Sequence, residues 1–328
     1  MYDITTIGSA IQDIYVFSNK FSVHADPRKT SGKSEYFEFG TKIELDDIFI
    51  GVGGGASNAA FTFKNQGFKT ACIARIGDDG TGVDVRKRIK NYGIKDIFIV
   101  DKNNRTGRGV FFLGRSGEKT VLVYRGATND FKASEIKENY IKNTKWLYLT
   151  SLGGNIATLE RISKLAEKFS KKIMINPGKN EIVKYKKRLL KVLKNSEIIL
   201  FNREEASLIS GRAFSNIKGM LEEMKKNCPN SIILITEGEH GLYTIVDNVM
   251  KHVIIKPVKS VDMTGAGDAF GSGFLAGYIK SKGNIYSALD LGVKNSAAVV
   301  REIGAKNGLL QKTKISKKIS SNIKNLIK

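Results

Sequence analysis

The sequence predicts an α/β fold of three layers, in which a mostly parallel central sheet lies between two layers of helices. One observation is an alternation of apolar runs of strand length with helical stretches, as in successive β-α-β units. A second is a loop of small residues, Thr264–Gly267, between a strand pattern at Val253–Ile255 and a helix, as at the ligand-binding edge of such sheets. The alternating strands are Trp146–Thr150, Lys172–Ile175, Ile198–Phe201 and Ile232–Thr236, and the helices are Ile156–Phe169, Glu181–Leu193, Glu204–Ser210 and Ile217–Asn227.

Length and composition exclude several classes of protein. The 328 residues allow one large α/β domain or two average ones. No apolar run reaches about 18 residues, and no basic segment precedes an apolar one at the start, so neither a membrane span nor a signal peptide is expected. Cys72 and Cys228 stand far apart without metal-ligand spacing. This argues against a disulfide scaffold or a zinc site and favours a cytoplasmic protein.

The formal net charge of +22 is the one unusual bulk property. A charge of this size is compatible with a nucleic-acid-binding protein. The lysines, however, are scattered over the whole chain without interleaved aromatic residues. We therefore expect no nucleic-acid partner, and a surface that attracts a small anionic substrate such as a nucleotide.

The stretch Ser260–Lys280 carries the chemistry. Gly265 and Gly267 allow the backbone to approach an anion closely, because they have no Cβ. The first N–H groups of the following helix have no internal partner and favour phosphate. Asp268, in the first turn, is either a residue that favours a helix N-terminus or a general base that takes a proton from an attacking hydroxyl. We predict the base, since a carboxylate beside a phosphate site otherwise only repels the phosphate.

Two segments resemble the signatures of the ribokinase-like (PfkB-type) carbohydrate kinases. DMTGAGDAFGSGF, beginning at Asp262, is similar to the C-terminal signature, and GGGASNAA, at Gly53–Ala60, to the N-terminal one. The resemblance implies a single ribokinase-like domain over residues 1–328, with a small lid of β-strands from about 14–50 and 108–125. It implies an ATP- and Mg²⁺-dependent kinase that phosphorylates an alcohol group of a sugar or nucleoside, with Asp268 as base and the N–H groups of Gly265, Ala266 and Gly267 as the anion hole.

On the acceptor side, a strand is predicted at Ile4–Ile7 and another at Ile14–Phe17. The resemblance assigns Asp13 to the hydroxyls of the acceptor. A carboxylate can accept hydrogen bonds from two neighbouring hydroxyls. Ile11 stands where ribose-specific members carry Asn, and Ser151–Gly154 where several carry Glu. Both departures favour an acceptor other than ribose.

The glycines at Gly51–Ala56 allow two interpretations. They match G-x-G-x-x-A, with an acid at Asp78 or Asp79, as in a nicotinamide-dependent oxidoreductase. Such a fingerprint normally follows the first strand of the domain, whereas here that strand ends in Gly8 alone. The resemblance instead places the backbone of Gly54 and Gly55 and the side chain of Asn58 against the substrate. A helix at Ala56–Gln66, a strand at Lys69–Ile76 and a helix at Val83–Tyr92 are expected to follow.

A lid excludes water that would otherwise accept the phosphoryl group. Strand character at Tyr36–Phe39 and Ile43–Ile50, and a hairpin of Val110–Leu113 with Thr120–Tyr124, predict its strands. The resemblance implies a homodimer formed through this lid. Arg108 and Arg125 would face the acceptor, which leaves a sugar phosphate, as in a phosphofructokinase-like enzyme, as an alternative substrate.

The resemblance also assigns the nucleotide and cation side. Glu205 would hold Mg²⁺ through water, beside Asn202, although the Asn202–Glu205 spacing equally fits a helix capping box. Asp262 would bind K⁺. The remaining ATP contacts are assigned to Thr236, Gly238, Gly241, Thr264 and Asn295.

The basic tail, Lys312–Lys328, alternates Lys with apolar residues in an amphipathic helical pattern. We expect a terminal helix docked on the core, with no membrane partner.

Overall fold

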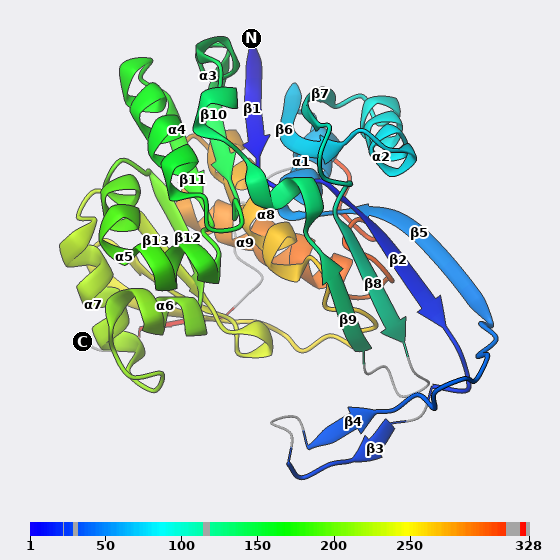
Figure 1. Ribbon diagram of the computed structural model, residues 1–328. Helices are drawn as coiled ribbons and strands as arrows, with labels where there is room; N and C mark the ends of the chain where they lie inside the picture. The colour runs from blue at the N-terminus through cyan, green and yellow to red at the C-terminus, as the bar shows by residue number, and fades with distance from the viewer. Residues whose placement is uncertain (22, 29–31, 114–118, 313–321, 326–328) are drawn as a thin grey trace.

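The computed structural model describes residues 1–21, 23–28, 32–113, 119–312 and 322–325. Within these residues, the main feature is a ten-stranded sheet (Figure 1). In spatial order its strands are β16 (Asn322–Asn325), β15 (Val249–Ile254), β14 (Leu242–Val246), β13 (Ile232–Thr236), β12 (Ile198–Asn202), β11 (Lys172–Ile175), β10 (Thr144–Leu149), β1 (Tyr2–Ile7), β6 (Thr70–Gly77) and β7 (Lys95–Asp101). Pairing is parallel from β7 to β13 and antiparallel from β13 to β16.

Helices cover both faces of this sheet (Figure 1). One layer holds α1 (Gly55–Asn65), α2 (Gly80–Asn91), α8 (Ala266–Lys280) and α9 (Ile285–Val299). The other holds α3 (Glu138–Lys142), α4 (Ile156–Lys168), α5 (Lys179–Lys194), α6 (Arg203–Ser210) and α7 (Ile217–Asn227).

The core lies on both sides of the sheet because successive strand residues point to opposite faces. In β10, Leu147 and Leu149 pack with the α4–α5 layer, whereas Trp146 and Tyr148 pack with α8 and α9. The parallel strands are thus buried on both faces, as all-parallel segments require. This confirms the predicted three-layer α/β fold.

A second sheet extends away from the central one and is called the lid sheet (Figure 1). Its strands, in spatial order, are β5 (Asp47–Gly53), β2 (Ile11–Phe17), β8 (Arg108–Leu113) and β9 (Lys119–Tyr124). β2 follows directly from the carboxyl end of β1, so the lid sheet begins at the edge where parallel strands present their ligands. A short pair, β3 (Val23–Ala25) and β4 (Lys33–Glu35), lies at its far end.

Two expectations about local structure are wrong. The segment Tyr36–Phe39 is not a strand, because the chain turns there, with the Thr41 N–H donating to the Glu38 carbonyl at 3.4 Å. The expected helix over Lys312–Lys328 is contradicted at Asn322–Asn325, which pairs with β15. Alternating Lys and Ile suits a strand as well as a helix, and β15 offers a free edge. The rest of that segment, 313–321 and 326–328, lies outside the described residues.

No helix within the described ranges has both the length and the apolar character that crossing a membrane requires.

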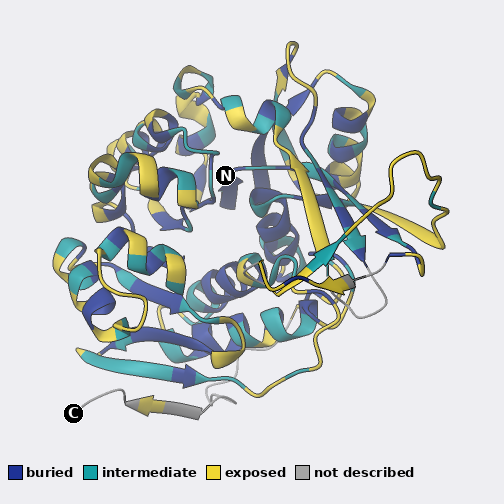
Figure 2. Ribbon diagram, turned by 60° about the horizontal axis from the view of Figure 1, so that its bottom comes forward, coloured by how far each residue is buried: buried dark blue, intermediate teal, exposed yellow. Residues whose placement is uncertain are grey.

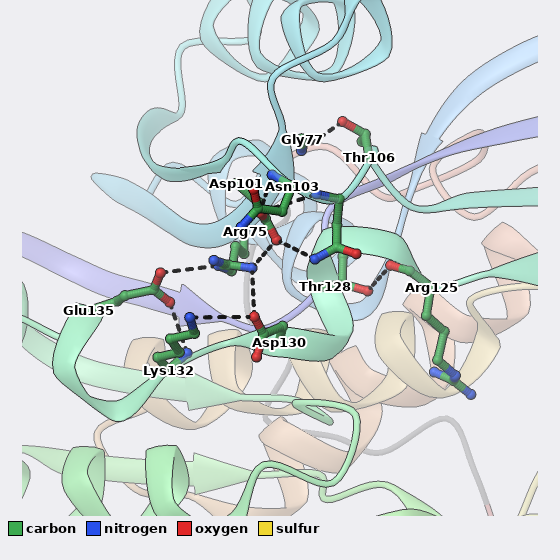
Figure 3. A network of polar contacts seen from close by, with 11 residues as sticks. Arg75, Gly77, Asp101, Asn103, Thr106, Arg125, Thr128, Asp130, Lys132 and Glu135 are labelled. Carbon is green, nitrogen blue, oxygen red and sulfur yellow. Dashed lines mark hydrogen bonds and ion pairs between the residues drawn. The ribbon is translucent and has the colours of Figure 1, made fainter.

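A buried ion network joins the lid sheet to the body (Figure 3). Arg75, at 5% exposure in β6, pairs with Asp101 in β7 and donates to Glu135 at 3.1 Å. Its guanidinium also lies 3.5 Å from Asp130. Asp130 and Glu135 end the two short 3₁₀ turns, Gly126–Asp130 and Ala133–Glu135, that follow β9. Arg75 therefore fixes the segment by which the chain returns from the lid sheet.

Candidate active site

The loop before α8 presents free backbone donors. Gly265 has φ +77, and a Cβ there would lie 2.5 Å from the Ala305 Cβ, so glycine is required. Among the described residues, the N–H groups of Gly265 and Gly267 have no acceptor. The N–H of Ala266 donates to the Met263 carbonyl at 3.2 Å. Two of the three amides assigned to the anion hole are thus available to an anion.

Asp268 lies in the first turn of α8, directly beside these amides. The Asn58 side chain, from α1, donates through Nδ2 to Asp268 Oδ2 at 2.8 Å. Burial raises the pKa of Asp268, while the Asn58 hydrogen bond and the charge of Lys306 oppose the rise. A half-buried carboxyl with an elevated pKa is suited to receive a proton near neutral pH.

Asp13, in β2, sits in a cradle formed by two glycines. It is 4% exposed. A Cβ on Gly53 would lie 2.0 Å from Asp13 Oδ2, and a Cβ on Gly109 3.0 Å from Oδ1. Burial raises the pKa of Asp13 to about 6, where Lys306 opposes the shift and Asp268 adds to it.

Filling the cradle should displace the carboxylate. We expect Gly53→Ala to raise the acceptor KM at least about tenfold, since a lost charged hydrogen bond costs about 1.5–3 kcal/mol. The matched control is Gly80→Ala at the start of α2, where a Cβ would meet no atom within 4 Å and which lies outside the cavity that Asp13 lines. Steady-state kinetics measure the acceptor KM of both variants. Equal acceptor KM values in the two variants would contradict a role of Asp13 in acceptor binding.

The pKa of Asp13 sets a pH dependence. Above pH 6 the group is a carboxylate that accepts hydrogen bonds from hydroxyls, and below pH 6 it is protonated and loses that capacity. Because protonation removes the competent form, kcat/KM for the acceptor should fall about tenfold per pH unit below 6. A profile between pH 5 and 8 measures this, and a level profile down to pH 5 contradicts it.

The charge of Lys306 opposes the raised pKa of both Asp13 and Asp268, and this residue was missed by the sequence analysis. Lys306 directly follows Gly304 and Ala305 in the turn after α9, and it belongs to neither signature segment. The residue as a whole is half-buried, but its ammonium lies inside the protein, where Nζ donates to Asn58 Oδ1 at 2.6 Å. A lysine among small residues outside the motifs carries no signal that distinguishes it from a surface lysine.

A cavity of about 400 Å³ opens beside this cluster. Asp13 and Lys306 line it on one side. Aromatic side chains line much of the rest, namely Tyr15, Phe49, Phe61 and Tyr92. The volume is in the range of small-molecule sites. Arg88, Asn91 and Asn307 add further polar side chains to the lining.

Gly54 and Gly55 stand at the start of α1, next to Asn58. Gly54 has φ +93, and a Cβ there would lie 2.6 Å from the Ser9 carbonyl oxygen. The N–H of Gly55 donates to Ser9 Oγ at 3.1 Å. These glycines allow β1 and α1 to approach closely, which brings Asn58 to Asp268.

The G-x-G-x-x-A pattern does not form a dinucleotide site. It follows β5, a lid strand, and not the first strand of the parallel sheet. Asp79 caps α2 by accepting from the Gly82 N–H at 2.8 Å. Arg108 is directed to Thr81 and Asp79. Arg125 is exposed, and its side chain points away from the Arg75 network (Figure 3). Neither arginine lines the cavity.

Asp262 already has a cationic partner. Its Oδ1 accepts from the ammonium of Lys119, at the start of lid strand β9, and from the Thr264 N–H at 2.9 Å. Its Oδ2 accepts from the Gly304 N–H at 3.0 Å. Lys119 also donates to Thr264 Oγ1. Asp262, assigned to K⁺, and Thr264, assigned to ATP, thus both accept hydrogen bonds from the Lys119 ammonium of the lid sheet.

Asn202 and Glu205 form the capping box at the start of α6. Asn202 Oδ1 accepts from the Glu205 N–H at 2.8 Å, and Glu205 Oε2 accepts from the Asn202 N–H at 2.9 Å. Burial raises the pKa of Glu205 to about 7, with Glu204 and Glu181 adding to it. Metal clusters of three or more His, Cys, Asp or Glu side chains do not occur in the described ranges. A hydrated Mg²⁺ needs only one or two protein carboxylates, so Glu205 remains suitable.

The residues assigned to ATP divide into two groups. Thr236 ends β13, and Gly238, with φ +54 and open space around it, lies in the adjoining turn. The N–H of Gly241 donates to the Gly238 carbonyl at 3.2 Å, and a Cβ there would lie 2.0 Å from the Val253 carbonyl oxygen. Asn295 is fully buried and donates to the Ala269 carbonyl at 2.8 Å. Gly241 and Asn295 therefore support the fold, whereas Gly238 borders open space.

Comparisons with known proteins show which family the chain is similar to. A family model described as "pfkB family carbohydrate kinase" matches residues 2–312. A relative from Archaeoglobus fulgidus named "Uncharacterized sugar kinase" is 28% identical over 74% of this chain and 96% of its own. A ribokinase of Staphylococcus aureus is 27% identical over 82% of this chain and 89% of its own. Among solved structures, a ribokinase of Giardia lamblia superposes with a TM-score of 0.76 at 19% identity, covering 95% of this chain and 98% of that one.

Proposed function

Because the chain belongs to the pfkB family of carbohydrate kinases, we propose that it transfers the γ-phosphate of ATP to an alcohol group of a sugar or nucleoside, with Asp268 as general base. The observation that carries the proposal is the position of the Asp268 carboxylate beside the unpartnered N–H groups of Gly265 and Gly267. Asn58 supports it by fixing that carboxylate.

In the proposed reaction, the acceptor hydroxyl gives its proton to Asp268 as its oxygen attacks the γ-phosphorus. The bond from that phosphorus to the bridging oxygen of ADP breaks, and ADP leaves. The N–H groups of Gly265 and Gly267 stabilise the charge on the migrating phosphoryl group, which is the largest contribution in reactions of this kind. Asp13 would accept hydrogen bonds from other hydroxyls of the acceptor and so orient it.

Mg²⁺, when bound, would neutralise charge on the ATP phosphates, with Glu205 holding it through water. Burial and neighbouring acids make the charged form of Glu205 costly without a cation, which supports this assignment. Thr236 and Gly238 are proposed to border the nucleotide.

We do not extend the proposal to K⁺, since Lys119 supplies a positive charge to Asp262. Replacing KCl by NaCl at equal ionic strength is therefore expected to change the rate by less than about twofold. Activation of tenfold or more by K⁺ would contradict the assignment of that charge to Lys119.

The partner is proposed to be a second copy of this chain, bound through the lid sheet. Its edge strands β5 and β9 expose apolar side chains, among them Ile48 at 52%, Leu122 at 57% and Val123 at 58% (Figure 2). Apolar residues clustered on exposed strands are typical of interaction surfaces. Light scattering after size-exclusion chromatography tests this, and a monomeric mass at all concentrations up to about 100 μM opposes it.

A screen of acceptors tests the proposed function. Purified protein with Mg²⁺ and ATP is offered D-ribose, 2-deoxy-D-ribose, D-fructose, fructose 6-phosphate, adenosine and inosine. We expect ADP release that depends on one class of acceptor, with an equal amount of new phosphomonoester by ³¹P NMR. Fructose 6-phosphate tests the alternative that the acceptor is a sugar phosphate. The positions of Arg108, which bonds to Thr81, and of Arg125, which is exposed, do not favour this alternative. ADP release that is independent of every alcohol would contradict the proposal.

A further inference from the structure

The Lys306 ammonium has three hydrogen-bond acceptors, none of which is a carboxylate. Nζ donates to Asn58 Oδ1 at 2.6 Å, to Ser57 Oγ at 3.2 Å and to the Val52 carbonyl. An ammonium has three donors, so all of them are used. Lys306 thus has no donor left for a substrate, and its role has to be exerted on its protein neighbours.

The partner that connects Lys306 to the reaction is Asn58. A side-chain amide has one oxygen that accepts and one nitrogen that donates, and rotation by 180° exchanges them. Ammonium can only donate, so it requires the oxygen of Asn58 to face it. The nitrogen then has to face Asp268, where it donates to Oδ2 at 2.8 Å. A flipped amide would place its oxygen against the carboxylate and repel it.

We propose that Lys306 is a positioning residue for phosphoryl transfer, which fixes the Asn58 amide so that its nitrogen donates to Asp268. This inference rests on the proposed function, because it concerns the base of that reaction. It adds a residue that lies in neither signature segment.

The charged and titratable groups around Asp268 show why a cation is needed. Besides burial, the charge of Asp268 raises the pKa of Asp13, which comes from the lid sheet. Tyr148, beneath α8 in β10, is fully buried, and its pKa is raised by burial and by Asp268. Lys306 is the cation that opposes the raised pKa of Asp268, and burial lowers its own pKa to about 8. Without Lys306 and the Asn58 hydrogen bond that it orients, burial would favour a protonated Asp268 that cannot act as base.

The test is a direct titration of Asp268, which needs no acceptor or nucleotide. The protein is labelled with ¹³C at the aspartate carboxyls, and the Asp268 signal is identified by its absence in Asp268→Asn. We expect Lys306→Met to raise the Asp268 titration midpoint by about 1–3 pH units. Lys306→Gln, which removes the charge but keeps a polar group, should raise it in the same direction and serves if the Met variant does not fold.

The matched control is Lys280→Met in the same helix as Asp268. Lys280 also has a partly buried ammonium that donates to a side-chain amide, Gln66 Oε1, at 2.7 Å, and lies near an aromatic ring, Phe68. It is in the last turn of α8, away from Asp268. We expect Lys280→Met to leave the Asp268 midpoint unchanged within about 0.3 units, because the charges are separated by more than a Debye length.

A double variant tests the route through Asn58. If Lys306 acts through the amide, then Lys306→Met should shift the midpoint less in an Asn58→Leu background than in the wild type, since coupled residues are not additive. Equal shifts in both backgrounds would overturn the route, and an unchanged midpoint in both Lys306 variants would overturn the inference as a whole. The proposed function fails separately, if Asp268→Asn phosphorylates the best acceptor of the screen as fast as the wild type.

Discussion

Replacing Asp268 by Asn is expected to lower kcat by about two to four decades, while affinity for ATP changes little. The amide keeps the size of the side chain and can still meet Asn58, so the start of α8 should retain its shape. What is lost is the ability to take a proton. The N–H groups of Gly265 and Gly267 remain free to bind phosphate, which is why nucleotide affinity should persist. Turnover with the best acceptor and calorimetric titration with a non-hydrolysable ATP analogue measure the two quantities.

The matched control is Asp96→Asn. Asp96 is a partly buried aspartate in β7 that pairs with Arg86 at 3.3 Å and lies away from α8. Its loss should leave kcat within about twofold, since a peripheral pair contributes about 0–1 kcal/mol. Near-full activity of Asp268→Asn would exclude the base role, whatever the acceptor.

Replacing Arg75 by Met is expected to lower the free energy of unfolding by about 3–5 kcal/mol, because it leaves the buried Asp101 carboxylate without its cation. Arg75 and Asp101 are both nearly inaccessible, with 6% and 3% of their side chains exposed. Glu135 and Asp130 lose the same partner (Figure 3). Denaturant unfolding of wild type and variant measures the difference.

An exposed pair provides the control for Arg75. Lys172 and Glu197 are 3.2 Å apart with 54% and 35% of their side chains exposed. Lys172→Met should cost less than about 1 kcal/mol, because solvent screens such pairs. If both variants lose equally little stability, the network of Arg75 does not hold the segment after β9 in place.

The sequence was most informative where one local pattern decided the structure. The strands and helices between Trp146 and Thr236 lie within a few residues of their expected limits, because each apolar run is buried in a sheet covered on both faces. The start of α8 was also predicted from the sequence. In the structure, Gly265 adopts φ +77 before the helix and Asp268 lies in its first turn, as expected. Such features depend on neighbours in sequence, which a single chain displays.

Contacts between distant residues could not be predicted. Lys306 meets Asn58 across 248 positions, and Lys119 meets Asp262 across 143. Nothing in the composition or periodicity around either lysine distinguishes it from the scattered surface lysines. The contact of Asn295 with the Ala269 carbonyl, through which α9 packs against α8, was likewise not predicted.

The antiparallel pairing at the edge of the sheet was not predicted, although the strand pattern at Val253–Ile255 overlaps β15. β14 and β15 have no helix between them, so the alternation that marks parallel units stops at β13. β16 joins β15 from a segment whose alternating Lys and Ile fit a helix and a strand alike. Tertiary pairing decided between the two, as it commonly does for short segments.

The central claim is that free amides before α8 hold the migrating phosphate beside Asp268. The most direct measurement is the amide NMR spectrum of protein labelled with ¹⁵N-glycine, recorded with Mg²⁺ and either the β,γ-imido analogue of ATP or AMP. Our account predicts that the Gly265 and Gly267 signals move with the triphosphate analogue and stay in place with AMP, which lacks the γ-phosphate. Signals that do not move when the analogue is bound would contradict it.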